Sequence, residues 1–245
     1  MDKLIYQSMT GAKALLDRLA VTSGNLANIA TTGYRAETHS VRAVQLQGEQ
    51  AATRAFAIES TTGADFTPGP MQSTGRALDV AVEGQGWIAV QLEDGSEAYT
   101  RNGSLQMNEN GVLQTRGGLN VSSGGGTITI PVGANITIGG DGIVSSVSTG
   151  AQVAQSTPLG RIKLVNPEEG ALVRGGDGLF RLKDGGAAEA DAKVRLASGH
   201  LEGSNVNATG ALVDMIATAR QFDLQMKLLQ SAEGNAQSAS KLLQV

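Results

Sequence analysis

Glycine and proline are distributed unevenly along the chain, and this limits its fold more than any other feature. Of the 33 glycines, 28 lie between residues 36 and 204, together with all five prolines. Glycine weakens the interior of a helix and proline breaks it, whereas both are common in turns. Residues 1–35 and 205–245 are therefore predicted to be helical, and the middle is predicted to be a turn-rich β structure.

Apolar side chains recur at steps of three and four residues near both ends. The first series is Ile5, Met9, Ala12, Leu16, Leu19 and Leu26, and the second is Leu212, Met215, Ala219, Phe222, Met226 and Leu229. This alternation is typical of the narrow apolar stripe of a coiled coil. A single helix cannot bury such a stripe, so we expect the helices to pair with each other or with neighbouring chains.

Helix-end signals flank both stripes. Gly33 follows Thr31-Thr32 where the first stripe ends, which is typical of a helix C-terminus. Asn207 or Thr209 is placed to cap the first turn of the second helix.

The middle of the chain is divided by turn dipeptides, among them Asp94-Gly95, Asn110-Gly111 and Asp141-Gly142. Strand-like runs such as Trp87–Leu92 and Asn135–Ile138 lie between these turns, a pattern that predicts antiparallel hairpins. The predicted fold class is α+β, with long N- and C-terminal α-helices paired as a coiled coil and a mainly antiparallel β-rich central domain.

Three regions follow from this pattern. Residues 1–35 together with 205–245 are predicted to form a discontinuous helical assembly domain, and 67–204 a β-rich outer domain. Residues 36–66 have no clear period and are interpreted as an extended connector.

Composition argues against most catalytic and nucleic-acid functions. The chain has no cysteine and two histidines, so thiol catalysis, disulfides and a three-histidine metal site are excluded. The net charge is −4 without a basic block, which disfavours a nucleic-acid surface. Carboxylate pairs such as Glu168-Glu169 flank turn residues and are interpreted as solvated loop charge. No enzyme activity, cofactor or metal is predicted.

Neither a membrane span nor a cleavable leader is predicted. No apolar run approaches the ~18 residues that a membrane helix needs, and the opening MDKLIYQSMTG lacks the apolar stretch of a secretory signal. The terminal stripes lie outside a middle that has its own core, and apolar surfaces that a domain does not need for itself indicate partners. The residues alone therefore point to an assembly protein.

Three blocks in register resemble the rod and hook family of bacterial flagellar axial proteins. The first is Asn25–Tyr34 (NLANIATTGY), the second is Thr74–Trp87 (TGRALDVAVEGQGW) with Tyr99–Leu105, and the third is Leu201–Asn207 (LEGSNVN) with Val213–Ile216 and Arg220–Asp223. Three residues at two places depart from the family pattern. Trp87-Ile88 stands where two phenylalanines are frequent, and Gly210 stands where an acidic residue is frequent.

The resemblance implies a structural subunit of the flagellar basal-body rod, a helical tube that transmits torque. The opening residues and compact length look most like a proximal-rod protein, and a distal-rod or hook-type subunit is the nearest alternative. A secreted β-rich binding module and a β-rich hydrolase with an Asp/Glu pair are alternatives from other classes. Implied partners are other copies of the chain, other proximal and distal rod proteins and the flagellar type III export apparatus, with a location in the periplasmic rod.

The resemblance and the apolar stripes together predict the residues of the assembly interface. Seven of them are expected to line the inner packing: Leu16, Leu19, Leu26, Met215, Phe222, Met226 and Leu229. The others are Ile5, Asn25, Asn28, Gly33, Tyr34, Asn205, Val206, Asn207, Ile216 and Arg220. If the Phe222 ring is fully buried, Phe222→Ala is expected to cost about 3–5 kcal/mol.

Overall fold

The structure is a computed structural model that describes residues 2–45, 55–131, 133–148 and 155–242. Its internal contacts divide the chain into two units. Unit 1 comprises residues 1–28, 37–65 and 206–245, and unit 2 comprises residues 29–36 and 66–205. Residues 29–36 thus group with the β-rich part of the chain. The division into a helical assembly domain, a connector and an outer domain that was expected from the sequence stays a prediction.

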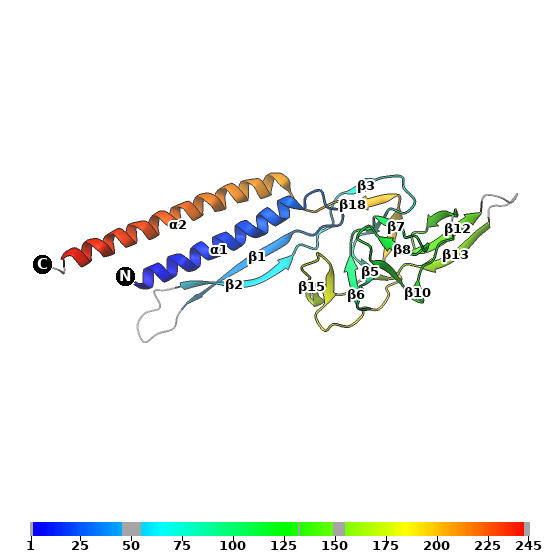
Figure 1. Ribbon diagram of the computed structural model, residues 1–245, viewed down its shortest axis with the longest axis horizontal. Coiled ribbons are helices and arrows are strands. Elements are labelled where there is room, and N and C mark those ends of the chain that lie inside the picture. Colours follow the sequence, from blue (N-terminus) through cyan, green and yellow to red (C-terminus); the bar gives the residue numbers. More distant parts are fainter. Residues whose placement is uncertain (1, 46–54, 132, 149–154, 243–245) are drawn as a thin grey trace. The chain divides into compact units, whose positions relative to one another are not determined.

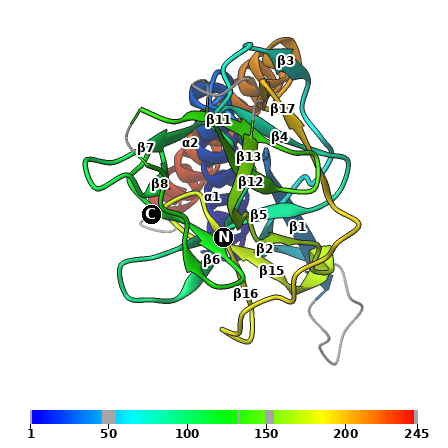
Figure 2. The ribbon, with the colours of Figure 1, turned by 90° about the vertical axis from the view of Figure 1, so that its right-hand side faces the viewer.

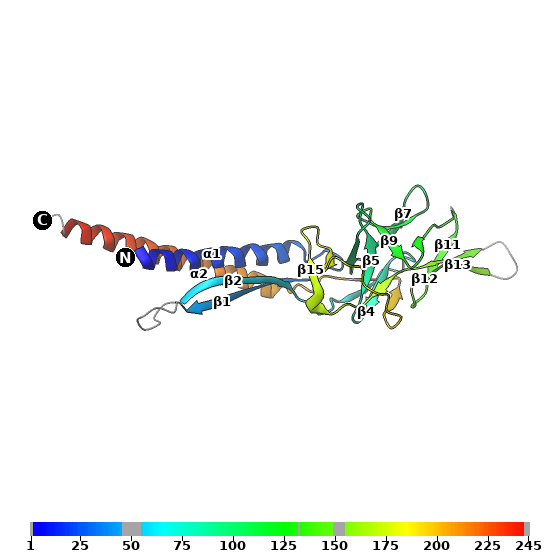
Figure 3. The ribbon, with the colours of Figure 1, turned by 90° about the horizontal axis from the view of Figure 1, so that it is seen from below.

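Unit 1 combines two helices with one hairpin. Helix α1 spans Asp2–Ala27 and helix α2 spans Ala208–Leu242, and strands β1 (Glu37–Gln45) and β2 (Ala55–Ala64) pair antiparallel. The two helices lie side by side (Figure 1), and the hairpin runs along α1 (Figure 3). Interpreting residues 36–66 as a connector therefore missed the pairing between its two extended segments.

The predicted coiled coil is wrong. The described chain has two α-helices against eighteen mainly antiparallel strands, and several large apolar side chains of the predicted stripes are exposed. Met9 of the predicted stripe is 61% exposed and Leu16 is 47% exposed. A coiled coil buries the apolar side chains of its seam between the helices, and these two side chains are not buried.

Small and polar residues take the buried positions of the helices instead. Ser8, Ala12 and Thr22 are buried on α1, and Thr218 is buried on α2. An ion pair joins Arg18 to Asp214 at 3.0 Å, and the Gln225 amide donates to the Ser8 carbonyl at 3.4 Å. The sequence pattern also misplaced one boundary, because α1 ends at Ala27 and not at Gly33.

Unit 2 is built around one large antiparallel sheet. Seven of its nine strands follow the order β15-β16-β6-β5-β9-β8-β7, with β10 paired to β9 and β14 paired to β5. Their bounds are β5 Trp87–Gln91, β6 Glu97–Thr100, β7 Leu105–Met107, β8 Leu113–Thr115, β9 Asn120–Ser123, β10 Gly126–Thr127, β14 Leu164–Val165, β15 Leu172–Arg174 and β16 Phe180–Leu182. A short 3₁₀ turn, Glu169–Ala171, precedes β15.

Three smaller sheets complete unit 2. Strands β11 (Asn135–Ile138), β12 (Ile143–Ser148) and β13 (Gln155–Arg161) form one, and β12 and β13 are seen side by side in Figure 2. Strand β4 (Val80–Glu83) pairs with β17 (Arg195–Ser198), and β3 (Met71–Ser73) pairs with β18 (His200–Glu202). The core lies between these sheets and is aliphatic, with Val80, Ile88, Leu105, Leu113 and Val121 almost fully buried.

Turn chemistry explains much of this topology. Gly95, Gly111 and Gly142 each follow Asp or Asn in the predicted turns, and each has a positive φ between 75° and 83°. Because only glycine adopts this conformation without strain, these dipeptides reverse the chain between strands.

Candidate functional site

The first family-like block, Asn25–Tyr34, contains a glycine whose neighbours leave no room for a side chain. Gly33 has φ +69°, and its backbone N–H donates to the Glu202 carbonyl at 2.7 Å. A Cβ at this position would lie 2.3 Å from the carbonyl carbon of Arg101. The first, second and third sequence blocks therefore meet at one point of unit 2.

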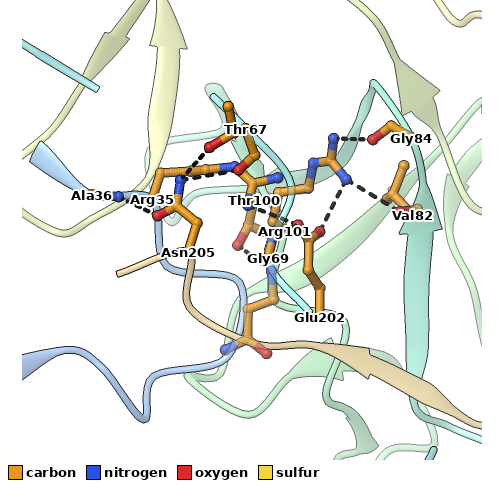
Figure 4. A network of polar contacts seen from close by, with 11 residues as sticks. Arg35, Ala36, Thr67, Gly69, Val82, Gly84, Thr100, Arg101, Glu202 and Asn205 are labelled. Atoms are coloured by element: carbon orange, nitrogen blue, oxygen red, sulfur yellow. Dashed lines mark hydrogen bonds and ion pairs between the residues drawn. The ribbon is translucent and has the colours of Figure 1, made fainter. Parts of the chain in front are cut away.

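A buried cluster of charges lies at this meeting point (Figure 4). A carboxylate oxygen of Glu202 lies 2.7 Å from Nη1 of Arg35, and the other lies 3.0 Å from Nη1 of Arg101. The side chains of Arg35, Glu202 and Arg101 are 0%, 2% and 3% exposed. Buried charges of this kind are tolerated when they are paired and hydrogen-bonded.

Backbone groups complete the surroundings of Glu202 and Arg101. The Gly69 N–H donates to Glu202 at 2.9 Å. Arg101 donates from Nη1 to the Val82 carbonyl at 3.2 Å and from Nη2 to the Gly84 carbonyl at 2.5 Å. The cluster thus connects five segments that are far apart in the sequence, and it holds them in one arrangement.

The cluster contains more positive than negative charge. Burial lowers the pKa of Arg101 to about 10, and the nearby Arg35 lowers it as well, while Glu202 acts in the opposite direction. Arg101 therefore stays protonated at neutral pH. Both guanidinium groups also lie over the ring of Trp87, at 5.9 Å for Arg35 and 5.5 Å for Arg101, which adds cation–π attraction.

Asn205 organises a second set of contacts beside the cluster. Its side-chain oxygen accepts from the Ala36 N–H at 2.7 Å, and its amide donates to the Thr67 carbonyl at 3.0 Å. Its own N–H donates to the Tyr34 carbonyl at 3.4 Å. Tyr34 is buried, and the guanidinium of Arg174 stacks 4.4 Å from its ring. Two predicted site residues, Tyr34 and Asn205, are therefore brought together in unit 2.

Asn25 and Asn28 have local roles in unit 1. The Asn25 amide donates to the Glu37 carbonyl at 2.8 Å, and the Glu37 N–H donates back to the Asn25 side-chain oxygen at 2.8 Å. This reciprocal pair fixes the start of β1. Asn28 donates from its side chain to the Gly24 carbonyl at 2.9 Å and so satisfies the last turn of α1.

Asn207 caps helix α2. Its side-chain oxygen accepts from the Gly210 N–H at 3.0 Å, which is the contact that the sequence predicted for an N-cap. Of the two candidates, Asn207 rather than Thr209 provides this cap, because α2 begins at Ala208.

The predicted helical interface residues do not share one environment. Leu16, Ile216, Arg220 and Met226 are exposed, whereas Leu19, Leu26, Val206, Met215, Phe222 and Leu229 are half-buried. Ile5 lies in α1, and its side chain falls outside the described part of the structure. Because Phe222 is half-buried, the cost expected for a fully buried ring does not apply to the single chain. The interface itself stays a prediction.

Reasoning from the sequence missed the charged cluster. Arg101 and Glu202 lie within the family-like sequence blocks, and Arg35 directly follows the first block. None of the three was predicted to be a site residue. The available signal was their charge, because all three lie next to apolar or glycine-rich runs where a buried ion needs a partner. Because the three residues lie far apart in the sequence, the sequence did not show that they pair with one another.

The described residues show neither a metal cluster nor a membrane helix. Within these ranges no three Asp, Glu or His side chains gather to hold a metal. No helix within these ranges is long enough and apolar enough to cross a bilayer.

Comparison with known proteins gives matches along the whole chain. Three family models match: "Flagella basal body rod protein" over residues 5–35, "Flagellar hook protein FlgE/F/G D1 domain" over 81–146 and "Flagellar basal body rod FlgEFG protein C-terminal" over 197–242. The flagellar basal-body rod protein FlgF of Escherichia coli is 46% identical over 99% of both chains, and that of Salmonella typhimurium is 45% identical over 99% of both. The rod protein FlgG of Agrobacterium fabrum is 32% identical, covering 96% of this chain and 97% of its own.

Proposed function

Since the chain belongs to the FlgF family of flagellar basal-body rod proteins and is a structural subunit of the proximal rod, we propose that it polymerises through its terminal helices. The observation that carries this proposal is a set of large apolar side chains that α2 leaves exposed. Leu224 is 60% exposed, and Val213 is 61% exposed. The set consists of Leu212, Val213 and Ile216 near the start of α2 and of Leu224, Met226 and Leu228 further along it.

Neighbouring exposed apolar side chains at helical spacing, such as Leu212 with Ile216 and Leu224 with Leu228, favour contact with other chains. Monomeric proteins rarely leave contiguous apolar surface in water, and such surface marks interaction sites. The partners we propose are further copies of this chain and other rod proteins. Heterologous contacts that do not close on themselves build a helical tube, which is the arrangement that a torque-transmitting rod needs.

The buried cluster of unit 2 suits the same function. Arg35, Glu202 and Arg101 join segments that lie far apart in the sequence, in addition to the strand pairs and backbone hydrogen bonds between them. A structure that transmits torque needs such internal connections, because a locally deformable subunit would absorb the rotation. We propose that the chain reaches the periplasmic part of the basal body through the flagellar type III export apparatus, and that it has a structural rather than an enzymatic role there.

A double substitution on the exposed face of α2 tests the proposal. We expect Leu224→Ser/Leu228→Ser to reduce incorporation into purified basal bodies at least severalfold when the variant is the cell's only copy. The stability of the isolated chain should change little, because both side chains are exposed before assembly.

The matched control is Gln221→Ser/Gln230→Ser, which changes two exposed polar residues of the same helix. We expect this control to be incorporated normally. Normal incorporation of the leucine variant would contradict the proposal, and so would an equal loss in both variants.

A further inference from the structure

Two exposed leucines of α2 lie on one side of the helix pair in unit 1. The ion pair between Arg18 of α1 and Asp214 of α2 marks this side. Leu224 and Leu228 follow Asp214 by 10 and 14 residues, and at about 100° per residue both lie within a quarter turn of it. Because they are four residues apart and exposed, they form an apolar ridge on the side of the ion pair.

Met226 and Leu212 lie on the other side of α2, and both are exposed. Met226 is two residues from each leucine of the ridge, which is about 200° around the helix. Leu212 precedes Met226 by 14 residues and therefore lies within about 40° of the same direction. The exposed Val213 and Ile216 lie between the two sides, on the surface of α2 turned away from α1.

Helix α1 adds two exposed apolar residues to this second side. Met9 and Leu16 precede Arg18 by nine and two residues, which is about half a turn in both cases. They therefore point away from the ion pair, and both are exposed.

The register of the helices brings the apolar residues of this side together. The helices run in opposite directions (Figure 1), and the Gln225 amide donates to the Ser8 carbonyl at 3.4 Å. Met9 follows Ser8 and Met226 follows Gln225, so the two methionines lie at nearly the same level. We call the surface of the second side the apolar face; it consists of Met9, Leu16, Leu212 and Met226.

The ridge and the apolar face carry different charges on α2. Arg220 lies four residues before Leu224, and Asp223 lies three residues before Met226, so each neighbours one of the two surfaces. Both are exposed, and neither forms an ion pair within the described residues. On α1, Lys13 adds a positive charge to the apolar face.

These charges favour contact between unlike surfaces. Two ridges in contact would bring Arg220 against Arg220 of the second copy. A ridge on the α2 part of an apolar face brings Arg220 toward Asp223, and opposite charges fix the register of such contacts.

Building on the assembly through α2 proposed above, we propose that the ridge of one subunit packs on the apolar face of another copy of this chain. The contact is heterologous, because it joins two different surfaces. Each added subunit therefore leaves one ridge and one apolar face free, and the assembly grows without closing as a dimer.

Introduced cysteines test this contact, because the chain has none of its own. Two copies are produced in the same cell, one with Leu224→Cys and the other with Met9→Cys, Leu16→Cys or Leu212→Cys, which gives three strains. Purified basal bodies are treated with a short bismaleimide, and the cross-linked peptides are identified by mass spectrometry. We expect cross-links from position 224 to at least one position of the apolar face.

The matched controls are strains in which one single-cysteine variant is the cell's only copy. We expect them to give at least severalfold fewer cross-links, because a ridge does not meet a ridge and an apolar face does not meet an apolar face. All four side chains are exposed in the single chain, so the variants are expected to fold.

Two outcomes would overturn the proposal. If single-cysteine strains cross-link as strongly as the mixed strains, like surfaces meet and the contact is not heterologous. If no mixed strain cross-links although both variants are present in the basal bodies, these two surfaces do not join copies of this chain. In that case the assembly function is judged separately, by whether Leu224→Ser/Leu228→Ser still fails to be incorporated.

Discussion

Single residues hold the meeting point of the sequence blocks in unit 2. Gly33 has a left-handed backbone and no space for a Cβ, and its N–H donates to the Glu202 carbonyl. The side chain of Glu202 pairs two buried arginines at once. Gly33 thus meets a requirement of backbone conformation and space, and Glu202 meets a requirement of charge.

We predict that Gly33→Ala destabilises the chain by at least about 2 kcal/mol, because it adds backbone strain and a steric clash. The measurement is urea unfolding of the isolated protein. Gly118→Ala separates the two causes, since Gly118 has φ +87° but no atom lies within 4 Å of the position that a Cβ would take. If Gly33→Ala is no less stable than Gly118→Ala, the predicted steric clash of a Cβ at position 33 with the Arg101 backbone is refuted.

We predict that Glu202→Gln lowers the free energy of unfolding by about 3–5 kcal/mol, because two buried guanidinium groups lose their carboxylate. The comparison is Asp177→Asn, which breaks the exposed pair with Arg181 and should cost about 0–1 kcal/mol. Chemical denaturation of both variants at neutral pH checks the difference. Equal losses would show that the buried cluster does not stabilise unit 2.

At the scale of elements, the segment before β4 shows how side chains hold a strand in place. Arg76 pairs with Asp79 at 2.5 Å and donates to the Leu105 carbonyl at 2.8 Å, while Thr74 donates to Asp79 at 2.8 Å. Burial raises the pKa of Asp79, but hydrogen bonds from Arg76, Thr74 and Ser104 outweigh it, and the net pKa lies below the usual value.

This pKa gives a prediction on acid stability. A carboxyl with a lowered pKa in the folded state stabilises the fold above its unfolded pKa of about 4, and the contribution is lost as pH falls through the folded value. We expect Asp79→Asn to be less stable than the parent at pH 7 and to lose less stability on acidification. Urea midpoints measured at pH 7 and at a pH below about 4 test this difference in acid sensitivity. The exposed Glu189→Gln variant is the control. If the stability of Asp79→Asn depends on pH as that of the parent does, Asp79 does not contribute to acid sensitivity.

Local patterns predicted part of these elements. Chain reversals were predicted at Asp94-Gly95 and Asn110-Gly111, and both glycines have the positive φ that such turns need. The predicted strands at 87–92 and 135–138 correspond to β5 and β11. The coiled coil failed because periodicity reports that one face is apolar but not what covers it. Leu16 and Met226 follow the expected spacing, yet both are exposed.

At the scale of the whole molecule, the two units differ in how much apolar surface they bury. Unit 2 contains a continuous aliphatic core, whereas among the described side chains of the helices in unit 1 the buried ones are few and small. Local stability follows buried apolar contacts, so the helices are expected to open more readily than the sheet.

We therefore predict that amide hydrogen exchange in the isolated chain is fast in α2 and slow in β5, where Ile88 and Val90 are fully buried. In purified basal bodies the exchange of α2 should slow markedly, because neighbouring subunits cover its exposed apolar side chains. Strong protection of α2 in a dilute monomer would contradict assembly-dependent stabilisation.

The family, the structural role and the positions of turns could be inferred from the amino acids alone, because these properties depend on residues close together in the chain. Which side chains are covered, and which charges meet, became visible in the folded chain. Arg101 and Glu202 are 101 residues apart, and Arg35 joins them from the other end of the chain. Their pairing follows from the way the sheets pack, since burial forces each charge toward the nearest opposite charge that the fold supplies.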